Sequence, residues 1–121
     1  MKLRIKGNSL RLRVSRSELA RLMSVGHIEE TIQFAPASDA RLTYALAVRE
    51  AGDDIGLEYR DQAVTVVLSP AVARRWAESE DVGIYGDGRV ALLVEKDFAC
   101  MDGNGPEDSD AFPNPKAGMV C

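Results

Sequence analysis

Apolar and basic residues alternate through residues 2–6 and 10–14. Leucine, isoleucine or valine occupies every second position, and lysine or arginine occupies the positions between them. This period of two is typical of half-buried β-strands. Gly7 and Asn8 separate the two runs and suit a two-residue hairpin turn, because glycine adopts positive φ without strain. The pattern predicts a β-hairpin with one apolar face and one basic face.

A short helix is predicted directly after this hairpin. Ser15 and Glu18 have the spacing of a capping box, in which each side chain bonds a backbone N–H of the other residue. Gly26 suits the left-handed position that ends many helices. Between these two ends, one apolar stripe is formed by Leu19, Leu22 and Met23.

Further strands are predicted at residues 28–34 and 41–49, where the alternation returns on either side of a polar loop at 35–40. The longest strand-like apolar segment runs from Val90 to Cys100. It is apolar on both faces, which is typical of a strand covered on both sides. We therefore expect this segment to form the central strand of the fold.

The second half of the chain repeats the pattern of the first half at a lag of 54 residues. Ser69, a helix cap followed by Pro70, corresponds to Ser15. The topology therefore reads β-β-α-β-β twice, over residues 1–49 and 55–100. This repeat is explained either by an internal duplication or by chance, because many small folds use the same succession of strands and helices.

These elements predict an α+β fold with a single domain over residues 1–100. Eight mostly antiparallel strands would form either a strongly curved sheet or a partly closed barrel, with the two short helices on one face or at its ends. Residues 101–121 differ in composition, because they are acidic and rich in glycine and proline. We expect this tail to dock on the domain through Phe112.

The composition narrows the class of protein. A net charge of −4 and a pI of about 5.0 disfavour a dedicated nucleic-acid binder. No apolar run approaches the roughly 18–20 residues that span a bilayer, and no apolar signal segment is present. We therefore expect a cytoplasmic protein without a membrane contact, in which Cys100 and Cys121 are reduced thiols.

The basic face of the first hairpin is the clearest candidate for ligand binding. It is either a solvated outer face or an anion site, depending on whether it points to solvent or into a cavity. Glu95 and Asp97 lie two apart on one strand face, so they form either an acid–base pair or ion pairs with a neighbouring strand. The candidate ligand-binding residues are Lys6, Arg11, Arg13, Glu95, Asp97 and Cys100.

Other kinds of site find less support. His27 is the only histidine, so we expect no metal site. The chain has no phosphate-binding glycine loop and no dinucleotide motif, so no cofactor is expected.

The leading interpretation is a non-enzymatic domain that binds another protein or assembles with itself, as a homodimer through a strand edge. The alternative is a site for a small molecule or polyanion in a barrel mouth lined by Lys6, Arg11 and Arg13. In that alternative, Glu95 or Asp97 would support a simple hydrolytic or transfer reaction.

Two motifs near the carboxyl end carry a resemblance to known proteins. Glu-Lys-Asp-Phe-Ala-Cys at 95–100 and Asp-Ala-Phe-Pro-Asn-Pro at 110–115, after the basic opening hairpin, resemble a small bacterial protein family of unknown function. The resemblance implies a bacterial single-domain protein and brings no activity, cofactor or partner. The motifs would either mark a site near the basic hairpin or hold the tail against a sheet edge.

Overall fold

Helices and strands follow one another in the order β-β-α-β-β, which occurs twice. The structure is a computed structural model that describes residues 1–98, Asp110 and Phe112. It confirms the predicted α+β class, with two short helices. The elements are β1 (Lys2–Lys6), β2 (Ser9–Val14), α1 (Arg16–Val25), β3 (His27–Gln33), β4 (Arg41–Val48), β5 (Ile55–Arg60), β6 (Ala63–Leu68), α2 (Pro70–Glu78), β7 (Gly83–Asp87) and β8 (Ala91–Lys96).

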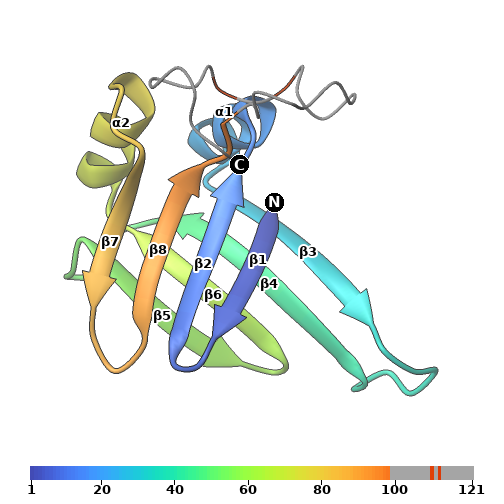
Figure 1. The fold of residues 1–121 in the computed structure, drawn as a ribbon. Coiled ribbons are helices and arrows are strands. Elements are labelled where there is room, and N and C mark those ends of the chain that lie inside the picture. The colour runs from blue at the N-terminus through green and yellow to red at the C-terminus, as the bar shows by residue number, and fades with distance from the viewer. Residues whose placement is uncertain (99–109, 111, 113–121) are drawn as a thin grey trace.

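The strands form two open four-stranded sheets, one in front of the other in Figure 1. Sheet A has the order β1-β2-β8-β7, and sheet B has the order β3-β4-β6-β5. Each sheet takes one hairpin from each half of the chain. The two hairpins are joined by a parallel pair, β2–β8 in sheet A and β4–β6 in sheet B. Because β8 lies between β2 and β7, the interior position expected for the Val90 segment is confirmed.

The two halves correspond in strand register as well as in element order. In the parallel pairs, Ser9 lies opposite Ala91, and Ala63 lies opposite Thr43. Ser9 and Ala63 begin β2 and β6 at the same lag of 54 residues that separates the two helix caps. The described chain therefore has an approximate internal two-fold arrangement. An origin by duplication stays a prediction.

Local sequence signals act at the predicted positions. Gly7 adopts a φ of +54° in the turn between β1 and β2. At the start of α1, Ser15 and Glu18 form both bonds of the capping box. At its end, Gly26 has a φ of +82°, and its N–H donates to the Leu22 carbonyl at 2.8 Å. These bonds satisfy backbone groups that a helix end otherwise leaves without partners.

The core lies between the sheets and continues to the helices, which lie at one end of the sandwich in Figure 1. Trp76 of α2 and Leu22 of α1 occupy corresponding positions in the two halves, and both are fully buried. Met23 was expected in the apolar stripe of α1 but is 37% exposed, because Leu19 and Leu22 alone face the core. In the described part of the chain, neither helix combines the length and apolar character that a membrane crossing requires.

The amino-terminal ammonium of Met1 binds two carboxylates. It contacts Glu18 of α1 and lies 2.7 Å from Glu30 of β3. Burial by itself would lower the pKa of this ammonium, but the hydrogen bonds and charges of the two glutamates raise it above the ordinary value of 8.0. Burial would likewise raise the pKa of Glu18, but the ammonium and Ser15 lower it below 4.5. The cluster joins the start of β1 to α1 and to sheet B.

We expect Glu18→Gln to lower the free energy of unfolding by about 1–2 kcal/mol near neutral pH. Glutamine retains the capping bond and removes only the charge. The raised pKa of Met1 means that its stabilisation is complete below pH 8.0 and is lost as the pH rises through the folded value. The lowered pKa of Glu18 means that its stabilisation is present above pH 4.5 and is lost as the pH falls.

Urea unfolding at a series of pH values checks this prediction. The difference between Glu18→Gln and the wild type should be largest between pH 4.5 and 8.0 and should shrink on both sides. The exposed Glu50→Gln is the matched control and should change little. A difference that does not vary with pH would contradict the ion-pair interpretation.

Two described residues of the tail, Asp110 and Phe112, contact the domain. The Phe112 N–H donates to the Asp97 carbonyl at 3.0 Å, and its ring lies edge-on to Phe98 with centroids 6.1 Å apart. The Asp110 carboxylate accepts bonds from the Ser17 N–H at 2.9 Å and the Ser17 hydroxyl at 2.5 Å. These bonds lower the pKa of Asp110, and the carboxylate lies where the positive end of the α1 dipole favours it.

Lys96 is the one buried charged side chain in the described chain, at 5% exposure. Its Nζ donates to the Ser79 carbonyl at 2.7 Å, just beyond the end of α2. The same ammonium lies 5.3 Å from the centre of the Phe112 ring. Burial lowers the pKa of Lys96, and the charges of Asp81 and Glu80 oppose that shift. Lys96 thereby connects the end of α2 to the aromatic residue of the tail.

Candidate anion-binding surface

The basic side chains of β1 and β2 lie on the outer face of sheet A. The strand register pairs Leu3 with Leu12 and Ile5 with Leu10, and Leu10 and Leu12 belong to the core between the sheets. Alternation along each strand places the intervening residues on the opposite face, toward solvent and not toward a barrel lumen. We call this surface the basic face, and it consists of Lys2, Arg4, Lys6, Arg11 and Arg13.

Glu95 of β8 offsets part of this positive charge. The parallel β2–β8 pair places it opposite Arg13. One carboxylate oxygen of Glu95 lies 3.2 Å from Arg11 Nε and 3.7 Å from Arg13 Nε. The other oxygen accepts a hydrogen bond from the Tyr85 hydroxyl at 2.9 Å. Burial raises the pKa of Tyr85 and the adjacent Glu95 raises it further, so the phenol remains the donor.

A shallow hollow of about 200 Å³ lies on the basic face. The β1–β2 register brings Arg4 opposite Arg11 and Lys6 opposite Ser9 at this point. Among the described residues, no carboxylate lines the hollow and no ion pair of Arg4 or Lys6 is formed. We call it the basic hollow, and its lining consists of Arg4, Lys6, Ser9, Arg11 and Leu93.

The structure brings together some of the site residues predicted from sequence and separates others. Lys6 and Arg11 line the basic hollow, and Arg13 and Glu95 lie beside it. Asp97 is not part of this group, because its carboxylate lies 2.9 Å from Lys2 Nζ beyond the end of β8. Cys100 and Cys121 lie outside the described residues.

Three lining residues and one supporting residue were not among the candidate ligand-binding residues. Arg4 and Ser9 share the outer face of the first hairpin with the predicted residues, so alternation could have found them. Leu93 reaches the hollow because β8 pairs with β2, and this parallel pairing has no signal in either strand alone. Tyr85 supports Glu95 from β7. Alternation with the buried Ile84 could have placed it on the outer face, but only the β7–β8 register shows that it reaches Glu95.

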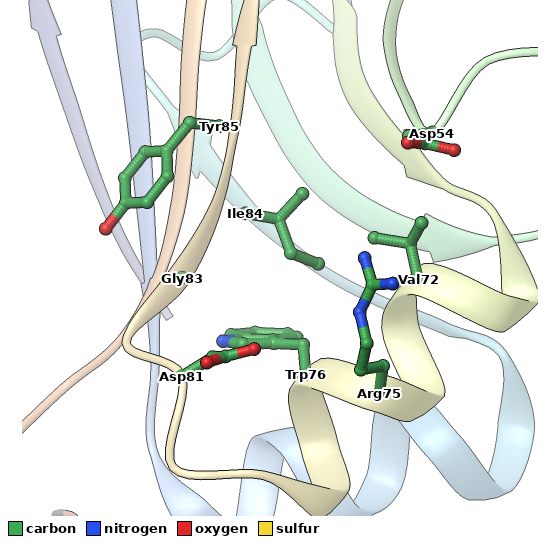
Figure 2. Close-up of a pocket in the computed structure, with 8 residues that line it drawn as sticks. All are labelled: Asp54, Val72, Arg75, Trp76, Asp81, Gly83, Ile84 and Tyr85. Atoms are coloured by element: carbon green, nitrogen blue, oxygen red, sulfur yellow. The ribbon is translucent and has the colours of Figure 1, made fainter.

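A second hollow of about 230 Å³ lies between α2 and β7. Figure 2 shows Val72 and Arg75 of α2 at the right with Asp54 above them, and Asp81 beside the indole of Trp76. Within the described chain, neither aspartate forms an ion pair with Arg75. Because charges of both signs line this small hollow, it selects no single ligand class.

Metal ligands are not grouped in the described chain. No cluster of three or more histidine, cysteine, aspartate or glutamate side chains in this part could hold a metal ion. The Nε2 atom of His27 lies 2.7 Å from a Glu29 carboxylate oxygen on the exposed surface of sheet B. The strongest candidate site in the described residues is therefore the basic hollow.

Comparison with known proteins finds one family. Its model, described as a family of unknown function (DUF7009), matches residues 1–116. No curated protein and no solved structure matches the chain. The matched segment includes both halves of the fold, the basic face and the residues Asp110 and Phe112.

Proposed function

Because the chain belongs to this family of unknown function, we propose its role from geometry, as a non-catalytic binding domain whose basic hollow holds an anionic group. The observation that carries the proposal is that Arg4, Lys6 and Arg11 line one hollow to which the described residues contribute no carboxylate. Like charges at such close spacing repel one another. A bound anion relieves this repulsion and therefore binds favourably.

The hollow suits a compact anion. Its volume of about 200 Å³ is below the roughly 300–1,000 Å³ of pockets that enclose a whole small molecule. Arginine binds phosphate and carboxylate groups through paired N–H donors, and the Ser9 hydroxyl adds a further donor. We therefore propose that the ligand is a phosphate or carboxylate group carried by a larger molecule or protein partner.

The arrangement of the carboxylates favours binding over hydrolysis or group transfer. Glu95 is held by Arg11, Arg13 and Tyr85, and Asp97 is held by Lys2. A general acid or base must reach a proton of the substrate, whereas these carboxylates are engaged in cross-strand contacts. The net charge of −4 also disfavours a nucleic-acid partner. The proposal retains the bacterial cytoplasm as the setting.

Titration with inorganic phosphate and with citrate tests the proposal. We expect both anions to shift the backbone NMR signals of Ser9 and Arg11 and to raise the melting temperature. The double variant Arg4→Gln/Lys6→Gln should weaken binding by about tenfold or more, because it removes two charged donors.

The matched control carries the same change of net charge on the exposed faces of the helices. It is the double variant Arg21→Gln/Arg74→Gln, whose arginines are both exposed. This control should bind both anions as the wild type does. An equal loss in the two double variants would assign the effect to net charge and would contradict a site in the basic hollow.

A further inference from the structure

Three large apolar side chains are exposed on the sides of β1 and β3 that otherwise face the core. Ile5, Ile32 and Phe34 are 59%, 47% and 65% exposed. Ile5 lies opposite the buried Leu10, and Ile32 and Phe34 continue the alternation that begins with the buried Ile28. Their exposure therefore reflects a missing cover and not an outward orientation. We call this region the open side.

The internal two-fold arrangement shows what is missing. On the opposite side of the sandwich, β5 packs against β7 and β8 of the other sheet. Gly86 permits this approach, since a Cβ atom there would lie 2.6 Å from a methyl carbon of Ile55. The corresponding strand, β1, has no comparable contact with β3 or β4 in the described chain. One side of the sandwich is closed and the other is open.

The open side begins below the cluster at Met1. There the ammonium binds Glu30, and the Tyr44 hydroxyl donates to the Met1 carbonyl at 3.5 Å. Beyond this point the sheets diverge, and Figure 1 shows the ends of β3 and β4 projecting past sheet A at the lower right. The projecting hairpin therefore presents its apolar face without a covering sheet.

In the described part of the chain, the two strands that border the open side are sheet edges of opposite charge. β1 is the edge of sheet A, and β3 is the edge of sheet B. β1 carries three basic residues and no acidic residue, whereas β3 carries Glu29 on its outer face. Its other glutamate, Glu30, already binds the Met1 ammonium of the same copy. An edge strand presents unpaired backbone donors and acceptors to any strand that can pair with it. Each copy of the chain thus carries both halves of a complementary contact, as a two-fold dimer requires.

We infer that the protein forms a two-fold homodimer in which the β3 edge of each copy lies along the β1 edge of its partner. Ile32 and Phe34 of one copy then cover Ile5 of the other, and Glu29 faces the basic side chains of the partner's β1. A second copy fits better than an anionic membrane surface, because the glutamates beside the apolar residues would be repelled there. The inference goes beyond the proposed anion site and does not require it.

Sedimentation velocity over a wide range of protein concentration tests the dimer. The wild type should sediment as a dimer, and Phe34→Ser should raise the dissociation constant by about tenfold or more. Val25→Ser is the matched control, because Val25 is equally exposed at 66% but lies at the end of α1, away from the open side. Both residues are exposed, so both variants should keep the circular dichroism and melting curve of a folded chain.

A charge exchange makes the test specific for the two edges. Glu29→Lys alone and Arg4→Glu alone should each weaken association, and the double variant should recover part of it. In a sample of mixed isotope labelling, nuclear Overhauser effects should connect Ile5 of one copy with Phe34 of the other. A wild type that remains monomeric at all concentrations would overturn the inference. So would a dimer that Phe34→Ser and Val25→Ser affect equally.

Discussion

Replacing Trp76 with alanine is expected to lower the free energy of unfolding by about 3–5 kcal/mol, the usual range for a buried aromatic residue. Trp76 is 1% exposed and packs in the core where α2 meets the two sheets. Removing the indole leaves a large cavity that the surrounding strands cannot fill without losing their register. A domain of this size has roughly 5–15 kcal/mol of stability in total, so the variant should be marginally folded. Urea unfolding followed by circular dichroism measures the loss.

Two further variants separate packing from other effects. Trp76→Phe retains most of the ring volume and loses the hydrogen bond from the indole N–H to the Val82 carbonyl, which measures 3.1 Å. That carbonyl also accepts the Lys96 N–H at 2.9 Å, so it is not left unsatisfied. We therefore expect Trp76→Phe to cost about 1–2 kcal/mol. The exposed Arg74→Ala on the same helix should change stability by less than about 0.5 kcal/mol. A loss of similar size in Trp76→Phe and Trp76→Ala would show that packing of the ring is not the main source of the stability that Trp76 provides.

The local elements were predictable because their signals lie within a few residues of each other. The capping box of Ser15 and Glu18, the left-handed Gly26 and the turn at Gly7 all act over one to four residues along the chain. The division into two sheets was not predictable in this way. Whether β2 pairs with β4 or with β8 depends on the summed packing of all strands, and both partners have largely apolar inner faces. Strand pairing across the two halves therefore had to come from the structure.

In the candidate site too, features set within one hairpin could be predicted, whereas features set by strands far apart in sequence could not. Alternation in β1 and β2 predicted the basic face correctly, because the side-chain period of a strand is fixed by its backbone. The contacts of Glu95 with Arg11 and Arg13 depend on the parallel β2–β8 pair. From the sequence, only an ion pair with some neighbouring strand could be predicted, and its partners could not be named. Lys96 lies on the same face of β8 as the buried Leu92 and Val94, where alternation favours an apolar residue. Its burial is explained by the carbonyl beyond the end of α2, which lies far away in sequence.

Gly83 at the start of β7 links the stability of sheet A to the support of Glu95. A Cβ atom at this position would overlap the Val94 carbonyl of the neighbouring strand and would lie 2.9 Å from Glu95 Cγ and 3.1 Å from the Tyr85 hydroxyl oxygen. The carbonyl belongs to the β7–β8 pair and cannot move without breaking that pair. The absence of a side chain at Gly83 therefore leaves the space in which Tyr85 reaches Glu95.

We expect Gly83→Ala to lower the free energy of unfolding by about 3 kcal/mol, the upper part of the range for overpacking a close contact. Gly88→Ala is the matched control, because a Cβ atom there meets only the Val90 carbonyl at an ordinary 3.9 Å. It should change stability by less than about 1 kcal/mol. In Gly83→Ala the NMR signals of Tyr85 and Glu95 should also shift, because the hydrogen bond between them cannot keep its geometry. If Gly83→Ala and Gly88→Ala were equally stable, β7 would have to adapt to the added methyl group, and the close contact of β7 with β8 would not hold in solution.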